Sequence, residues 1–190
     1  MHGTKDEGTR QSDEGLGYHD RLPLRWAQLA ALPAGEEAEH LAETNAKLLA
    51  AVALLEEHMK PGDEPSPTEL ELQRIHHKLN LLLELVSGFV NLQSPRPAAV
   101  SLRLSWRGVS WETADTGLVA GSVGLVEIYP SRVLPQALRW PARIAAVAGN
   151  TVSADFDAMP DYCQAALERH VFQHHRREVA EARQPARQGS

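Results

Sequence analysis

The sequence predicts an α+β protein that is mainly β: a small antiparallel β-barrel with a C-terminal helix and a long two-helix coiled-coil insertion. Apolar residues recur every 3.5 residues on average between residues 36 and 90, which is the repeat of a coiled coil. From Ala98 onward, apolar and polar residues alternate as they do in half-buried strands. After residue 160 the pattern becomes helical again and predicts a terminal helix over residues 161–182.

The composition excludes several classes of protein. A net charge of -6 leaves no basic excess to neutralise phosphates, so neither nucleic acid nor an anionic membrane is the expected partner. No apolar run reaches the roughly 18 residues that a membrane span needs. The first 17 residues lack the apolar core of a secretory signal. Cys163 is the single cysteine, which excludes an internal disulfide, and these observations together predict a cytoplasmic protein.

Breaks in the pattern divide the chain into five segments. Residues 1–17 are polar and aperiodic, which predicts a disordered tail. Residues 18–34 are expected to hold the first barrel strand, and residues 35–93 the helical hairpin. Two prolines at positions 95 and 97 end the second helix. Residues 97–182 are expected to form the barrel and its terminal helix, and residues 183–190 a polar tail.

The two helices of the insertion carry matching heptad seams. Between them, residues 60–65 contain two prolines and a glycine that no helix crosses. Ser66 can cap the amide three residues on, and Pro67 fits the first helical position of the second helix. We expect both seams to form the oligomerisation interface. The seam residues are Leu41, Asn45, Leu48, Val52, Leu55 and Met59 in the first helix, and Leu72, Ile75, Leu79, Leu82, Val86 and Phe89 in the second.

The second helix is more apolar than one seam requires. Leucines at positions 81, 82, 83 and 85 widen its apolar surface beyond half of its circumference, so we expect helices from other copies to cover it. Leucine at the first apolar position of the heptad and isoleucine at the second favour trimers or tetramers over dimers. We therefore expect a homotetramer. Asn45 in the first seam would set the register at a cost in stability. The alternative is a helical hairpin closed within one chain.

Other candidate sites carry weaker patterns. His170 and His174 are one helical turn apart, as two metal ligands on a helix must be, but Arg169, Arg176 and Arg177 surround them. The pattern favours an exposed basic helix face over a metal site. The sequence holds no Gly-rich phosphate loop between a strand and a helix, and no nucleophile elbow. We therefore expect no metal, no cofactor, no catalytic residue and no enzymatic activity.

A candidate nucleotide site combines two separated pairs of residues. Arg21 and Arg25 lie four residues apart in the first expected strand, and Ser105 and Gly108 lie where a later strand enters a turn. The guanidinium group of arginine binds phosphates and the acceptor edge of guanine through two parallel hydrogen bonds. A serine hydroxyl adds a donor and an acceptor, and a glycine lets the backbone approach a ligand.

These residues resemble the two motifs of the PilZ domain family. That family carries Arg-x-x-x-Arg and Asp/Asn-x-Ser-x-x-Gly, and residues 103–108 match the second motif at Ser105 and Gly108. With heptad helices inserted after the first strand, the chain is similar to an atypical tetrameric PilZ group of xanthomonads. The resemblance implies a six-stranded barrel with a C-terminal helix and, for many members, a receptor for the bacterial second messenger cyclic di-GMP. The likeness extends over Leu125–Pro130, Pro141–Ile144 and Val152–Phe156.

One departure from the family pattern bears on ligand binding. Arg103 stands where the family has an acid or an amide, and a guanidinium has no acceptor for the donor edge of guanine. Losing such a buried pairing costs about 1–3 kcal/mol, which is roughly a tenfold to hundredfold loss of affinity. We therefore expect weak or no binding of cyclic di-GMP.

The resemblance then implies a non-enzymatic adaptor in cyclic di-GMP-linked control of motility or virulence. Such an adaptor acts through contacts with other signalling proteins, which the sequence does not identify. The alternative is a genuine cyclic di-GMP receptor that binds the dinucleotide through Arg21, Arg25, Ser105 and Gly108.

Overall fold

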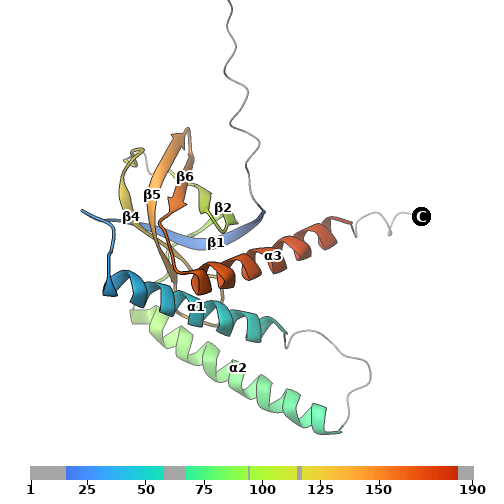
Figure 1. Cartoon of the computed structure of the whole chain (residues 1–190). Helices are drawn as coiled ribbons and strands as arrows, with labels where there is room; N and C mark the ends of the chain where they lie inside the picture. Colours follow the sequence, from blue (N-terminus) through green and yellow to red (C-terminus); the bar gives the residue numbers. More distant parts are fainter. Residues whose placement is uncertain (1–15, 58–66, 94, 115–116, 184–190) are drawn as a thin grey trace, which may run out of the picture.

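The computed structural model describes residues 16–57, 67–93, 95–114 and 117–183, which form a closed six-stranded barrel with helices on its outside (Figure 1). All strand pairs are antiparallel, and the order around the barrel is β1-β2-β3-β6-β5-β4. The predicted fold class is therefore confirmed. The elements are β1 (Gly17–Gln28), α1 (Glu36–Glu57), α2 (Pro67–Gln93), β2 (Ala99–Ser105), β3 (Gly108–Glu112), β4 (Val123–Ile128), β5 (Leu138–Ala148), β6 (Thr151–Phe156) and α3 (Asp161–Arg183).

Strand β1 closes the barrel because it pairs with two different strands. Its first half, Gly17–Pro23, pairs with β2, and its second half, Leu24–Gln28, pairs with β4. Pro23 lies where the partner changes, a position that suits a residue without a backbone donor. Gly149 and Asn150, a pair typical of two-residue hairpin turns, join β5 to β6, and Gly149 adopts the positive φ of 60° that this turn requires.

The core fills the barrel and extends under two helices. Inward-facing side chains alternate with exposed ones along the strands, as the period of two predicts. On α3 the buried side chains Cys163, Leu167 and Val171 face the same core, and burial raises the pKa of the Cys163 thiol to about 11. The largest fully buried side chains on the strands are Tyr18, Leu104, Val126, Ile128, Leu138, Trp140, Ile144 and Val152.

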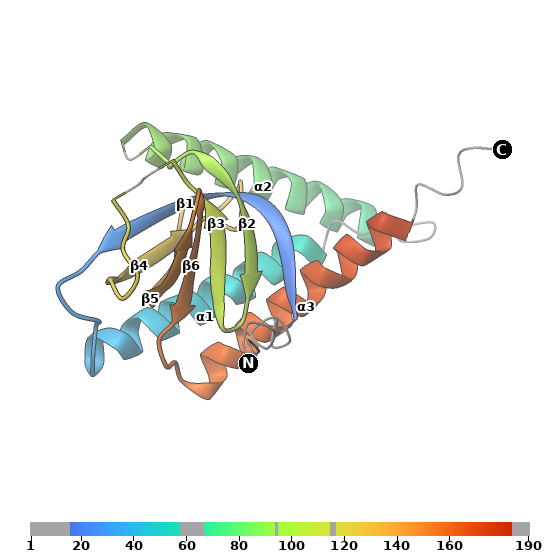
Figure 2. The ribbon, with the colours of Figure 1, turned by 90° about the horizontal axis from the view of Figure 1, so that it is seen from above.

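Helix α1 packs on β5 and α3, which differs from the expected pairing of its seam with that of α2. The seam residues Leu48 and Val52 are buried in this contact, and Leu41 and Leu55 are half-buried. The reason is that α3 and β5 present apolar surface to α1 within the same chain. In two perpendicular views α1 lies between α3 and α2 (Figure 1, Figure 2).

Helix α2 begins at Pro67 as expected, but it turns its more polar side toward the rest of the chain. The side chains with reduced exposure recur at helical spacing: His76, Asn80, Leu83 and Ser87. Ser87 is buried, and its hydroxyl donates a hydrogen bond to the carbonyl of Val133. The apolar side of α2 consequently faces outward.

Some expectations fall outside the described residues. They include residues 1–15 and 184–190 of the tails predicted at 1–17 and 183–190, and the seam residue Met59, whereas Gly17 belongs to β1 and Arg183 to α3. None of the described helices has an apolar stretch long enough to cross a membrane.

Candidate functional site

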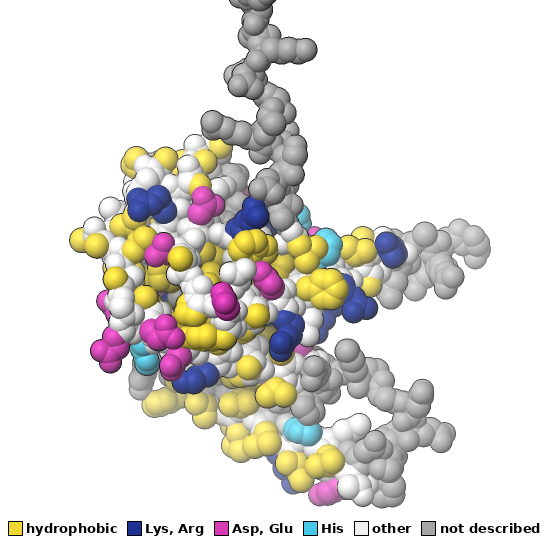
Figure 3. All heavy atoms as spheres, in the orientation of Figure 1, with side chains coloured by type: hydrophobic (Ala, Val, Ile, Leu, Met, Phe, Trp, Pro, Cys, Tyr) yellow, Lys and Arg dark blue, Asp and Glu magenta, His cyan; other side chains and the backbone are white. Residues whose placement is uncertain are grey.

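The outward side of α2 is a continuous apolar surface. We define the α2 face as the six seam residues of this helix, each of which keeps about half of its surface exposed in the single chain. Figure 3 shows hydrophobic side chains along this lower part of the molecule. An exposed apolar patch of this length marks an interaction site in a soluble protein. The exposed fractions are Leu72 49%, Ile75 46%, Leu79 50%, Leu82 57%, Val86 56% and Phe89 62%.

Asn45, which the heptad pattern places in a helical seam, binds the barrel instead. Its side-chain Nδ2 donates to the carbonyl of Arg139 over 2.8 Å, and its Oδ1 accepts the Arg139 amide over 2.8 Å. In the described strands, β6 pairs with β5 only from Ala142 onward, so the edge of β5 at Arg139 is open on that side. The Asn45 amide therefore completes the hydrogen bonding of a strand end.

Arg25 is held by a buried carboxylate. Its Nε and one terminal nitrogen donate to Oε2 of Glu127, and the Nε–Oε2 distance is 2.8 Å. Arg139 lies on the other oxygen, with Nε 3.2 Å from Oε1. Glu127 is 4% exposed, and its hydrogen bond raises the pKa of the Arg25 guanidinium. Arg25 thus forms part of an ion-pair network within the barrel. We call this network of Glu127, Arg25 and Arg139 the Glu127 clamp. The clamp accounts for the presence of an acidic residue among the apolar residues of β4.

Ser105 and Gly108 stabilise the hairpin between β2 and β3. The Ser105 hydroxyl donates to the Gly108 carbonyl over 3.1 Å and accepts the Gly108 amide over 3.2 Å. A Cβ at Gly108 would lie 2.2 Å from the backbone oxygen of Ala154, so a side chain is excluded there. Both motif residues therefore have a structural role within the described chain.

The structure does not bring the two motif pairs together. Gly17 of β1 pairs with Ser105, whereas Arg21 pairs with Ser101. At about 3.3 Å per residue, Arg21 lies roughly 13 Å and Arg25 roughly 26 Å along β1 from the level of Ser105. Arg21 is exposed, and within the described residues its side chain forms no hydrogen bond or ion pair with Glu127 or with the hairpin.

A cleft of about 600 Å³ opens beside the hairpin that holds Ser105 and Gly108. The guanidinium of Arg107 lies over the Trp106 ring, 4.8 Å from its centroid, and this stacked pair forms one wall. Arg103, Asp155 and Asp157 also line it, so both charges are present. Sequence reasoning missed the stacked pair, whose only signal is an aromatic residue next to an arginine in a turn.

His170 is buried, which corrects its assignment to an exposed basic face. It is 5% exposed, and its Nε2 lies 3.1 Å from the Tyr18 hydroxyl. Desolvation, followed by the nearby His174, lowers the pKa of His170 to about 3, so the ring is neutral. His174 stacks on Tyr18 and its Nε2 lies 3.2 Å from Oε1 of Glu56. Within the described residues, no three metal-ligating side chains converge here or elsewhere.

Comparisons with known proteins agree with this fold. Residues 46–184 match the model of a family described as an atypical PilZ domain, a cyclic di-GMP receptor. Among solved structures, the chain is similar to a pathogenic protein from Xanthomonas campestris, described as a new tetrameric PilZ domain self-assembled via an unusual helical bundle. The two are 28% identical with a TM-score of 0.69, over 88% of this chain and 92% of that one. A comparison with curated proteins gives no match.

Proposed function

Because the chain belongs to the atypical PilZ domain family, we propose that it is a non-enzymatic bacterial regulatory adaptor that works as a homotetramer. The exposed α2 face is the observation that carries this proposal. In an isolated chain this apolar surface would remain in water, and its burial against other copies is favoured at about 25 cal/mol per Å². The X. campestris neighbour, which is tetrameric through a helical bundle, supports the same arrangement.

The same observations support weak or no binding of cyclic di-GMP. Arg25 is already paired with Glu127, and the hairpin uses Ser105 and Gly108 for its own hydrogen bonds. The cleft at the hairpin presents Arg103 where guanine recognition needs an acceptor. On this proposal the cytoplasmic protein controls motility or virulence through protein contacts with signalling partners.

Light scattering on the purified chain tests the assembly. We expect a mass of about four times the 20.9 kDa chain. Leu79→Lys with Leu82→Lys should dissociate the assembly because two charges would be buried in an apolar interface. Gln73→Lys with His77→Lys adds the same charges to exposed positions off the α2 face and should leave the mass unchanged. A monomeric wild-type chain contradicts the proposal.

A cyclic di-GMP receptor is the second candidate function, which the description of the family favours. Calorimetry with cyclic di-GMP separates the two. We expect no heat of binding at micromolar ligand. Micromolar or tighter binding that Arg21→Ala and Ser105→Ala abolish, with the fold retained, would establish the receptor in place of the non-binding adaptor.

A further inference from the structure

A second apolar surface lies on α3 and the β2–β3 hairpin, away from the α2 face. Leu16, Trp106, Val171 and Phe172 line a groove of about 430 Å³, together with Arg169. We call these residues, with the adjoining side chain of Arg176, the aromatic–arginine groove. Val171 forms its buried floor, while Leu16 is 42% and Phe172 49% exposed. Within the chain this surface is separate from the α2 face, because α1 lies between α3 and α2 (Figure 1, Figure 2).

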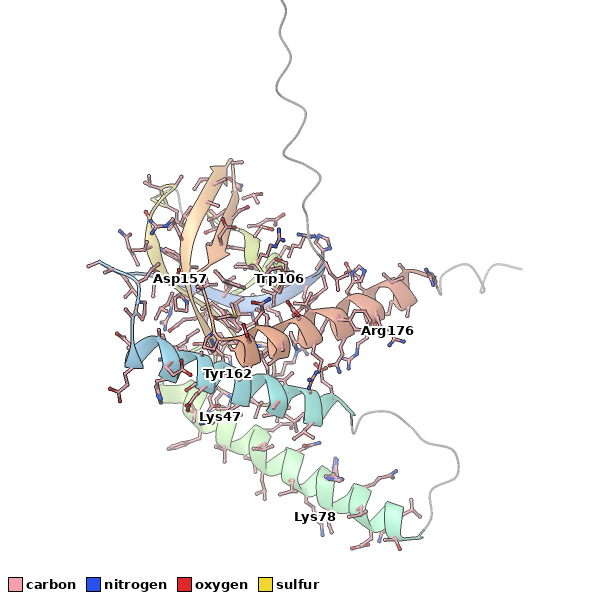
Figure 4. The ribbon with its side chains drawn as sticks, viewed as in Figure 1. Lys47, Lys78, Trp106, Asp157, Tyr162 and Arg176 are labelled. Atoms are coloured by element: carbon pink, nitrogen blue, oxygen red, sulfur yellow. The ribbon has the colours of Figure 1, made fainter. Side chains whose placement is uncertain are left out.

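The groove carries positive charge on a protein whose net charge is negative. Arg176 lies over the Phe172 ring, 5.7 Å from its centroid, and Arg107 lies over Trp106 at the opposite side. Figure 4 labels Trp106 on the hairpin and Arg176 on α3. Glu168 is the acidic side chain among the lining residues, and it accepts a hydrogen bond from Gln164. The lining residues thus include one arginine and one carboxylate, and the excess of positive charge comes from Arg107 and Arg176, which lie over the two aromatic rings.

Two of these arginines have no carboxylate partner within the part of the chain that the structure describes. Arg169 forms no ion pair there, and Arg176 has the Phe172 ring as its contact. By contrast, Arg177 on the same helix binds Oε2 of Glu56 over 2.8 Å. One arginine of the helix thus pairs with a carboxylate of α1, and two remain beside the apolar groove. Aromatic residues together with arginines are also the composition of binding hot spots in protein interfaces.

We propose that the aromatic–arginine groove binds an acidic segment of a partner protein. One large apolar side chain of that segment packs against Phe172 and Trp106, and its carboxylates pair with Arg169 and Arg176. Charge complementarity around an apolar centre favours this partner. The proposal rests on the proposed adaptor function and names the surface and the chemistry through which the tetramer recognises other proteins.

A random dodecapeptide display library, selected against the full-length tetramer, tests the proposal. Selections run in parallel against wild type, against Phe172→Asp, and against Arg169→Glu with Arg176→Glu. We expect wild type to enrich peptides that combine leucine or phenylalanine with glutamate or aspartate. Calorimetry with an enriched peptide should show at least tenfold weaker binding to Phe172→Asp. The double charge reversal should instead enrich basic peptides.

Arg132→Glu with Arg183→Glu is the matched control, because it changes net charge equally at exposed positions outside the groove. Its enriched peptides should match those of wild type. Circular dichroism and light scattering confirm that each variant folds and stays tetrameric.

Three outcomes would overturn the proposal. Equal enrichment on wild type and Phe172→Asp would reject the groove while leaving the adaptor function standing. No enrichment on any variant would count against both the groove and the adaptor function. Binding of a single-stranded thymidine dodecanucleotide that Arg169→Glu with Arg176→Glu abolishes would assign the groove to nucleic acid instead.

Discussion

Substitution of Asn45 by leucine distinguishes two roles for this residue: a polar position in a coiled-coil seam, and a hydrogen-bond partner of the Arg139 backbone. A polar residue in a helical seam lowers stability, so the heptad interpretation predicts that Asn45→Leu makes the protein more stable. The structure predicts the opposite sign. The leucine would leave both the amide and the carbonyl of Arg139 without the partners that they now have at 2.8 Å.

The magnitude follows from the two hydrogen bonds. Each buried backbone group that loses its partner costs about 1–3 kcal/mol, and the added apolar burial of leucine returns about 1–2 kcal/mol. We therefore expect Asn45→Leu to lower the free energy of unfolding by about 2–3 kcal/mol, taking a total loss of about 4 kcal/mol for the two groups. For a chain of this length that loss corresponds to a Tm lower by about 4–12 °C.

Urea unfolding and calorimetry at a fixed protein concentration measure this change, since the assembly makes Tm depend on concentration. Asn45→Asp keeps the shape and the acceptor but loses the donor to the Arg139 carbonyl, so it should also destabilise the fold. Lys47→Leu adds the same leucine to α1 at an exposed position and should change stability by less than about 0.5 kcal/mol. An Asn45→Leu protein at least as stable as wild type would refute the reasoning.

Three further perturbations test other parts of the fold. His170 stays neutral in the folded protein, with its pKa lowered to about 3 by burial, whereas the unfolded chain takes up the proton near pH 6.5. The free energy of unfolding should therefore fall by about 1.4 kcal/mol per unit as pH drops from 6.5 toward 4, and His170→Gln should reduce this slope in urea titrations. Gly108→Ala places a Cβ against the backbone of β6 and should lower Tm, whereas Gly88→Ala, in open space on α2, should raise it by removing a helical glycine. Arg25→Ala removes a partner of the buried Glu127 carboxylate and should destabilise the barrel in thermal unfolding without ligand, while an unchanged Tm would show that the clamp is dispensable.

Much of the fold is predictable because the signals are local. The change of period at Ala98 separates helices from strands, and Pro67 marks the observed start of α2. The glycine at position 149 predicts the β5–β6 turn that forms. These features depend on backbone preferences and on a periodicity that neighbouring residues share, so they do not need the rest of the chain.

The candidate site was less predictable because its contacts join distant parts of the chain. Arg25 and Glu127 are 102 residues apart, and Asn45 meets Arg139 across 94 residues. Spacing alone suggested that Arg25 serves a ligand and that Asn45 serves a coiled coil. Each instead satisfies a polar group of the barrel, which only the pairing of β1 with β4 and the packing of α1 on β5 reveal.

The amino-acid sequence by itself determined the kinds of element, their order and the excess of apolar surface in the two inserted helices. The tertiary structure decided which of those surfaces is covered within one chain. Helix α1 buries Leu48 and Val52 against the barrel and α3, whereas α2 anchors its polar side through Ser87 and leaves its leucines outside. The physical reason is that a heptad repeat indicates only that one side of a helix is apolar, whereas the shape of the barrel and its unpaired strand edges determine which helix is buried.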